Sequence, residues 1–262
     1  MKILTFLSDF GHFSSYVAQM KGIASSMTDA RLVDISHDIT KYNVEEGAFV
    51  LMTAVPYFPD ETVHVAVVDP GVGTERKGIV VKAIGHLLVG PDNGLLIPAA
   101  RFLGSFKVFE ITNGKYMLPN VSCTFHGRDV FTPVAAHLAN GVLPEEIGEE
   151  IDDYVNLDFG KSKQIDGKII GKIIYIDRFG NVITNIRGDE FLEHVNYNKK
   201  IRVSIKDKNY EIQFIESYGF VNKNEMLLTV GSHGFVEVST NQGDVSKALR
   251  IERGNEVIVY LD

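Results

Sequence analysis

The sequence has very little cysteine: Cys123 is the only one among 262 residues. A single cysteine cannot form a disulfide within the chain or supply a cysteine-rich zinc site. This usage fits a reducing compartment. A lone cysteine is more often a small core residue than a nucleophile, so we expect Cys123 to be buried.

Long apolar runs and an excess of positive charge are also missing. No run approaches the roughly 18 apolar residues of a membrane helix, and Asp9 interrupts the apolar start MKILTFLSDF too early for a signal-peptide core. The 26 Lys and Arg are outnumbered by 34 Asp and Glu, giving a net charge of -8. This balance disfavours sequence-independent nucleic-acid binding, so we expect a cytoplasmic protein with neither nucleic-acid nor membrane partners.

Several standard site motifs are absent as well. The sequence contains no HExxH and no EF-hand spacing, so we expect no metal site. It contains no GxSxG, which leaves a serine-hydrolase elbow unsupported. The site must therefore be sought in less standard patterns.

The first part of the chain alternates between strand and helix patterns. The composition is ordinary for a globular protein, 45% hydrophobic and 23% charged. Alternation of this kind predicts an α/β domain with a mostly parallel central sheet, which we assign to residues 1–155. Ser14 is the expected N-cap of the first helix and Gly141 the expected C-cap of the last. The expected strands are 3–8, 31–36, 62–69, 78–84, 86–90 and 106–112, and the expected helices are 15–27, 44–58, 95–103 and 127–141.

The pattern changes after about residue 150. A polar stretch, 151–167, precedes a region in which short apolar runs recur with turn residues between them. Many short strands at such spacing indicate a small barrel or sandwich, so we expect a smaller, all-β, barrel-like domain over residues 165–262. Its expected strands are 171–177, 181–186, 200–205, 209–215, 225–231, 234–239 and 256–262, with short helices at 187–195 and 243–249.

The stretch VVDPGVGTER, residues 67–76, resembles a phosphate loop at first sight. It fails the Walker A pattern, and the third glycine that a dinucleotide fingerprint needs comes too late, at Gly78. A strand pattern follows instead of a helix, which disfavours a phosphate at a helix N-terminus. Asp69 then stands at the carboxyl edge of the sheet, where it either faces a ligand or caps its own turn.

Other polar residues follow strands in similar positions. Asp9 ends the first strand, where its two carboxylate oxygens could each accept a proton from a ribose hydroxyl, or where it could cap the turn. His126 stands just before a helix and could be a base, an orienting group or an ordinary loop residue. The remaining candidates, which also suit hairpin turns, are Asp177, Phe179, Asn181, Ser232 and Glu237.

A series of stretches, in order over nearly the whole chain, resembles one known family. They are LSDFGHFSSYVAQMKG, VDISHDI, VAVVDPGVGTER, GPDNGLL, TFHGRDVFTPVAAHLA, DRFGNVITNI and GSHGFVEV. The family is the S-adenosyl-L-methionine hydroxide adenosyltransferases, adenosyl-forming hydrolases related to the 5′-fluoro- and 5′-chloro-5′-deoxyadenosine synthases. The resemblance implies hydrolysis of S-adenosylmethionine to adenosine and methionine without a cofactor. It also implies a homotrimer that binds its ligand between subunits.

The resemblance also assigns roles to residues. The hydrolase set of the family corresponds to Asp69, Arg76 and His126. The halogenases have a tyrosine at the position of Asp69, and the fluorinase has a serine at that of Gly127, so this chain departs from them in favour of water. The implied substrate-binding residues are Asp9 for the ribose, Phe125 and Phe179 for the adenosine pocket, Asn181 for the adenine, Asp177 and Ser232 for the amino-acid end, and Glu237 near the ammonium.

Three alternatives stay open from the sequence. The chain could use chloride in place of water, it could bind adenosine or S-adenosylmethionine without turnover, or it could be a structural trimer with a vestigial site. The proton acceptor is also open. Asp69 or His126 could take the proton from water, whereas Arg76 cannot, because its pKa exceeds about 12.

Overall fold

The computed structural model describes residues 2–261 and divides into two compact units, Met1–Asp158 and Phe159–Asp262. Each unit has its own sheet and its own hydrophobic core. None of the helices in the described part is long and apolar enough to cross a membrane.

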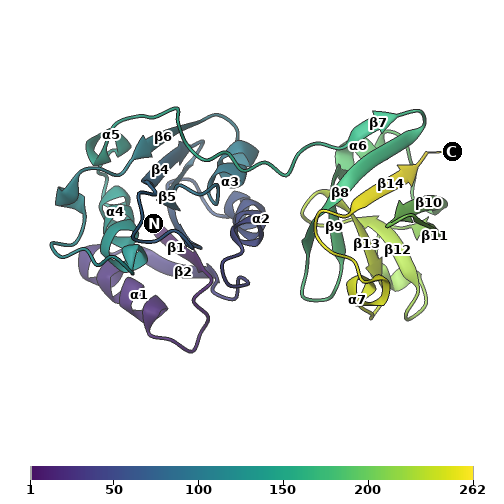
Figure 1. Ribbon diagram of the computed structural model, residues 1–262, viewed down its shortest axis with the longest axis horizontal. Helices are drawn as coiled ribbons and strands as arrows, with labels where there is room; N and C mark the ends of the chain where they lie inside the picture. The colour runs from purple at the N-terminus through teal and green to yellow at the C-terminus, as the bar shows by residue number, and fades with distance from the viewer. Residues whose placement is uncertain (1, 262) are drawn as a thin grey trace. The chain divides into compact units, whose positions relative to one another are not determined.

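The first unit is built on a six-stranded sheet with the order β2-β1-β3-β5-β4-β6 (Figure 1). β2, β1, β3 and β5 are parallel, whereas β4 is antiparallel to both of its neighbours. β1 and β3 are buried along their whole length, as expected for parallel strands that helices cover on both faces. The strands are β1 (Ile3–Ser8), β2 (Arg31–Ser36), β3 (Thr62–Val67), β4 (Gly78–Ala83), β5 (His86–Pro91) and β6 (Phe106–Glu110).

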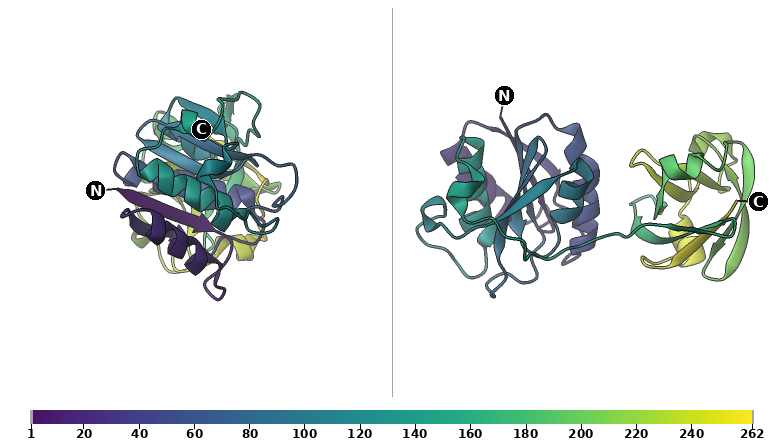
Figure 2. Two further views of the ribbon diagram at one scale, coloured as in Figure 1. Left: turned by 90° about the vertical axis from the view of Figure 1, so that its left-hand side faces the viewer. Right: turned by 90° about the horizontal axis from the view of Figure 1, so that it is seen from above.

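Helices cover both faces of this sheet (Figure 2). α1 packs against α4, and α2 packs against α3. The chain passes from β1 to β2 on one side and returns across β1 to β3 on the other, so right-handed crossovers place α1 and α2 on opposite faces. The helices are α1 (Tyr16–Met27), α2 (Val44–Ala54), α3 (Ile97–Leu103), α4 (Thr132–Ala139) and the short α5 (Pro144–Ile147).

Several helix ends differ from the sequence prediction: the C-cap of α4 is Asn140 and not the predicted Gly141, and α3 begins at Ile97 and not at residue 95. The N-cap of α1 is Ser15, which makes no side-chain capping bond, and the hydroxyl of the predicted cap Ser14 donates to the carbonyl of Phe10. The predicted helix 44–58 ends as an α-helix at Ala54 and continues as a single 3₁₀ turn, Val55–Tyr57, that contains Pro56. Proline tightens and ends helices because it has no N–H to donate.

The predicted helix 127–141 begins as a π-helix, Gly127–Phe131, before it becomes α4. Pro133 has no N–H to donate to the carbonyl of Asp129, four residues earlier. The N–H of Leu118, from the preceding loop, bonds to that carbonyl instead at 2.9 Å. The wide first turn is thereby anchored to the loop that leads to His126.

The second unit is a closed β-barrel of seven strands, confirming the predicted all-β, barrel-like domain. The sheet runs β14-β10-β11-β12-β13-β9-β8, and β8 pairs with β14 to close it. A short strand absent from the prediction, β7 (Lys163–Ile165), extends from β8. The barrel strands are β8 (Lys168–Ile176), β9 (Val182–Arg187), β10 (Lys199–Ile205), β11 (Lys208–Phe214), β12 (Met226–Val230), β13 (Phe235–Thr240) and β14 (Glu256–Tyr260), with helices α6 (Gly188–Leu192) and α7 (Val245–Leu249).

Candidate functional site

A cavity of about 420 Å³ lies at the carboxyl edge of the first sheet. Asp9 follows β1 and Asp69 follows β3, two neighbouring strands whose connections leave in opposite directions. Such a switch point is where open α/β sheets bind ligands. Asp9, Asp69, Phe125 and His126 all line this cavity.

The turn after β3 brings Arg76 back against Asp69. Arg76 Nε donates to Asp69 Oδ1 at 3.2 Å and Nη2 donates to Oδ2 at 2.6 Å. Both side chains are nearly buried, with 10% of Arg76 and 5% of Asp69 exposed. Burial raises the pKa of the Asp69 carboxyl above its ordinary value of 3.8, although Arg76 opposes the shift. Asp69 is thus a paired carboxylate that binds a proton more readily than one in water.

His126 completes the group from a distant part of the chain. Arg76 Nη2 lies 3.1 Å from His126 Nδ1. A guanidinium can only donate hydrogen bonds, so Nδ1 is the acceptor and the imidazole proton lies on Nε2. Burial and the charge of Arg76 both lower the pKa of His126, in agreement with a neutral ring. In this state His126 offers a donor to the cavity.

A glycine allows the two loops of this group to approach each other. Gly73 has φ 77°, and a Cβ on it would lie 2.2 Å from the carbonyl oxygen of Cys123. The loop of Asp69 and Arg76 therefore touches the loop of His126 through backbone atoms. Cys123 is exposed, so the prediction that it is a core residue was wrong. It belongs to this connecting loop and contributes backbone to the contact.

An ion pair between the partly exposed Arg128 and the buried Asp129 supports the His126 loop. Arg128 donates to both carboxylate oxygens of Asp129, at 2.6 and 3.0 Å, and Asp129 also accepts the N–H of Ser122. The guanidinium of Arg128 stacks 5.1 Å from the ring centroid of Phe125. These contacts fix the loop on both sides of His126.

Asp9 lies in the same cavity with an aromatic cluster beside it. The backbone N–H of Tyr42 donates to Asp9 Oδ2 at 2.9 Å. The rings of Phe10, Tyr16 and Phe125 are 5.0 to 5.7 Å apart. Phe10, Tyr16 and Tyr42 also line the cavity but are missing from the sequence-based candidates. Tyr16 and Tyr42 are brought to Asp9 only by the folded loops, whereas Phe10 is its neighbour in the sequence.

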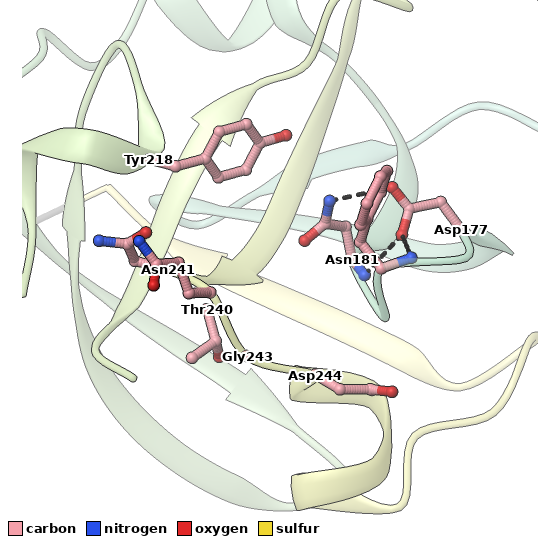
Figure 3. A pocket seen from close by; sticks show the side chains of 9 residues that line it. Asp177, Asn181, Tyr218, Thr240, Asn241, Gly243 and Asp244 are labelled. Atoms are coloured by element: carbon pink, nitrogen blue, oxygen red, sulfur yellow. Dashed lines mark hydrogen bonds between the residues drawn. The ribbon is translucent and has the colours of Figure 1, made fainter. Parts of the chain in front are cut away.

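A second cavity, of about 790 Å³, lies in the barrel unit. Figure 3 shows Asp177 and Asn181 on one side and Tyr218, Thr240 and Asn241 on the other. The predicted residues Asp177, Phe179 and Asn181 all line it. The carboxylate of Asp177 accepts the N–H groups of Phe179 and Asn181 and the side-chain amide of Asn181. Asp177 therefore organises its own turn, as the simpler interpretation of the sequence held.

Glu237 and Ser232 are not among the residues that line this cavity. Glu237 is 3% exposed, and its Oε1 accepts from the Tyr218 hydroxyl at 2.7 Å. His233 Nε2 lies 3.0 Å from Oε2 of Glu237, and the N–H of Phe235 donates to His233 Nδ1. Ser232 is exposed in the turn between β12 and β13. Glu237 thus supports Tyr218, a cavity residue that the sequence did not reveal.

Two groups of predicted residues result, one in each unit. The first contains Asp9, Asp69, Arg76, Phe125 and His126, and the second contains Asp177, Phe179 and Asn181. Within residues 2–261, no cluster of three or more His, Cys, Asp and Glu side chains could hold a metal ion.

Family models and known proteins similar to this chain identify its family. The chain matches the family model of the SAM hydroxide adenosyltransferase N-terminal domain over residues 4–148 and that of the C-terminal domain over residues 171–258. An (R)-S-adenosyl-L-methionine hydrolase from Methanocaldococcus jannaschii is 40% identical, over 99% of this chain and 97% of its own. The crystal structure of an uncharacterized conserved protein from Thermotoga maritima matches with TM-score 0.93 and 37% identity, covering 98% of this chain and 100% of that one. A fluorinase from an Actinoplanes species is 25% identical, over 98% of this chain and 97% of its own.

Proposed function

This chain belongs to the S-adenosyl-L-methionine hydroxide adenosyltransferase family, and we propose that it hydrolyses S-adenosylmethionine to adenosine and L-methionine. The observation that carries this proposal is the hydrogen-bonded group of Asp69, Arg76 and His126 at the edge of a cavity. Water attacks C5′ of the sulfonium, the C5′–S bond breaks, and methionine leaves as a neutral thioether. One proton is released from the attacking water.

Asp69 is the proton acceptor in our proposal. His126 cannot accept at Nε2 while Arg76 donates to Nδ1, because Nε2 then carries the ring proton. The two oxygens of Asp69 carry four lone pairs, and the two bonds from Arg76 and the backbone N–H of Gly71 leave one for the proton. The raised pKa of Asp69 improves it as a base at neutral pH.

His126 and Arg76 have supporting roles. The Nε2–H of His126 donates to the oxygen of the attacking water, which leaves the second lone pair of that oxygen for C5′. Arg76 contacts both Asp69 and His126 and keeps the imidazole in the required tautomer. Positioning of this kind can supply several kcal/mol of the barrier, up to roughly 7–11 kcal/mol in ideal cases.

The leaving group needs no acid, because a sulfonium already departs as a neutral thioether. Substrate recognition then falls to the remaining residues. We assign Asp9 to the ribose hydroxyls and Phe125 to the adenosine pocket, beside the rings of Phe10 and Tyr16. In the barrel unit, we assign Asn181 and Phe179 to the adenine and Asp177 to the methionine ammonium, with Ser232 at the same end of the substrate.

For Glu237 we propose a role other than the one that the resemblance implies. Its carboxylate is buried and bonded to Tyr218, Ser239 and His233. We therefore assign it to holding Tyr218 in the cavity wall instead of binding the ammonium directly. The homotrimer with sites shared between subunits, the lack of a cofactor and the cytoplasmic location remain predictions, and light scattering of the purified protein tests the first.

A direct test is incubation of the purified protein with S-adenosylmethionine in chloride buffer, followed by chromatography of the nucleosides. The proposal predicts adenosine and methionine in equal amounts. Appearance of 5′-chloro-5′-deoxyadenosine would support the halogenase alternative. Binding of S-adenosylmethionine without either product would support the non-catalytic one, and each of these results would overturn the proposal.

A further inference from the structure

A hydrogen-bonded series of side chains begins at Ser8, the residue before Asp9, and continues through His37 and Asp34 to Lys21. Ser8 Oγ is 2.7 Å from His37 Nδ1, and His37 Nε2 is 3.0 Å from Asp34 Oδ1. Lys21 Nζ bonds to the other oxygen of Asp34 at 2.5 Å. Ser8 and His37 are 0% and 1% exposed, whereas the Asp34 side chain is 36% exposed. The series therefore connects the protein surface at Asp34 to Ser8, which precedes the cavity residues Asp9 and Phe10.

The directions of these hydrogen bonds follow from the groups involved. The Asp34 carboxylate can only accept, so the ring proton of His37 lies on Nε2. Burial lowers the pKa of His37, although Asp34 opposes the shift, and the ring is neutral at pH 7. Nδ1 of His37 is then an acceptor, and the Ser8 hydroxyl donates to it. The lone pair of Ser8 Oγ accepts the N–H of Phe10 at 3.3 Å.

His37 also contacts the far end of the same loop. Its backbone carbonyl accepts the N–H of Gly11 at 2.8 Å. One residue thus holds residues 8–11 at both ends, through its ring at Ser8 and through its backbone at Gly11. The two residues between these contacts, Asp9 and Phe10, line the cavity.

We propose that His37, oriented by Asp34, is a positioning residue that holds the Ser8–Gly11 loop so that the Asp9 carboxylate meets the ribose hydroxyls. This inference rests on the proposed function, because Asp9 needs a ribose to bind. It predicts that the Ser8–His37–Asp34 series affects binding of the ribose diol and not the rate of the chemical step at C5′.

Ser8, His37 and Asp34 are the residue types of a serine-hydrolase triad, but their position excludes that function. Ser8 does not line the cavity and has no exposed surface. Its hydroxyl already donates a hydrogen bond to His37 and accepts one from the N–H of Phe10. A nucleophile must reach its substrate, so Ser8 is excluded from that role.

The same strand supplies a matched control. Thr5, also on β1, bonds to the buried ring of His64 with the same 2.7 Å distance between hydroxyl oxygen and Nδ1. Thr5 and His64 are each 0% exposed, and neither lines the cavity. Ser8→Ala and Thr5→Val therefore each remove a β1 hydroxyl that is hydrogen-bonded to a buried imidazole. Only the first change touches the Asp9 loop.

The test compares these variants with two substrates, S-adenosylmethionine and its analogue that lacks both ribose hydroxyls. Ser8→Ala should lower kcat/KM for S-adenosylmethionine roughly tenfold, through KM, with a much smaller loss for the analogue. Thr5→Val should change kcat/KM little, and by the same factor for both substrates. Equal losses for the two substrates in Ser8→Ala, or equal behaviour of the two variants, would overturn the inference.

A second variant and a second measurement cover a failure of Ser8→Ala to fold. Asp34→Asn alters a partly exposed residue and should give the same selective loss for the diol substrate, in smaller degree. Amide hydrogen exchange needs no turnover: exchange at Phe10 and Gly11 should accelerate in Asp34→Asn and Ser8→Ala but not in Thr5→Val. Unchanged exchange in the folded variants would refute the positioning role. A wild-type protein that releases no adenosine would instead refute the proposed function.

Discussion

Arg76 Nη2 lies 3.1 Å from His126 Nδ1, and this contact fixes the proton of the imidazole on Nε2. The same Nη2 atom donates to Asp69 at 2.6 Å. In our proposal, this one guanidinium nitrogen sets His126 as a donor and leaves Asp69 as the acceptor for a proton from water. The following predictions depend on this division of roles.

Asp69→Asn should lower kcat by at least about 100-fold, because the amide cannot take up the proton from water. The matched control is Asp189→Asn. Arg187 holds Asp189 with a similar fork, Nε–Oδ1 at 2.9 Å and Nη2–Oδ2 at 2.6 Å, at an exposed site in the barrel unit. Steady-state adenosine release measures both variants. Near-normal kcat in Asp69→Asn, or an equal loss in Asp189→Asn, would contradict the assignment.

The pH dependence should show an acid limb. Activity needs Asp69 ionised, with a pKa raised from 3.8 by burial, and His126 neutral, with a pKa lowered from 6.5 by burial and Arg76. Activity should therefore be lost as the pH falls from neutral through the range between 6.5, below which the pKa of His126 lies, and 3.8, above which the pKa of Asp69 lies. A kcat that stays constant from pH 7 to pH 4 would contradict this account.

Arg76→Met should move the titration of His126 upward. Removing the cation removes one cause of the lowered pKa of His126, so the ring should protonate at higher pH than in the wild type. NMR of the imidazole Cε1–H resonances measures this without any turnover. His137 is the internal control, because burial and Lys115 lower its pKa, and Arg76 is not among the causes. An unshifted His126 titration would show that the contact with Arg76 does not govern its protonation.

Gly73→Ala should impair activity through backbone displacement. Its Cβ would lie 2.2 Å from the Cys123 carbonyl oxygen, which cannot move without carrying the His126 loop with it. Gly254→Ala is the matched control, since Gly254 has φ 80° against 77° for Gly73 but no atom within 4 Å of the added Cβ. Both variants should lose roughly 1 kcal/mol or more of stability from left-handed strain. Only Gly73→Ala should lose kcat, and equal kcat in the two variants would contradict the prediction.

The sequence predicts the layers of the fold well because they depend on local patterns. The buried runs at 3–8 and 62–67 and the helical spacing of 16–27 determine the α/β unit, and the turn-bounded apolar runs determine the barrel. The sequence did not predict the π-helical start at Gly127. That start is accompanied by a bond from the N–H of Leu118, outside the helix, to the carbonyl of Asp129, and the helical spacing of 127–141 carries no sign of it. Cys123 was misplaced because loop exposure has no periodic signal.

The candidate site was predictable only in part. Asp69 and Arg76 are seven residues apart around one turn, so a local argument brings them together. His126 joins them across 50 residues. Its place just before a helix made it a candidate, but only the family resemblance grouped it with Asp69 and Arg76. Tyr42, Tyr218 and His37 act through contacts made by distant loops. No local pattern distinguishes them from ordinary surface or core residues.

The most direct test of the central claim is turnover of S-adenosylmethionine in water labelled with oxygen-18, with mass spectrometry of the adenosine. Attack of water at C5′ predicts one labelled oxygen in the 5′-hydroxyl of every adenosine released, and none in methionine. Asp69→Asn should reduce the amount of adenosine without changing its labelled fraction. Adenosine without the label would contradict the account, because its 5′-oxygen would then come from a source other than water.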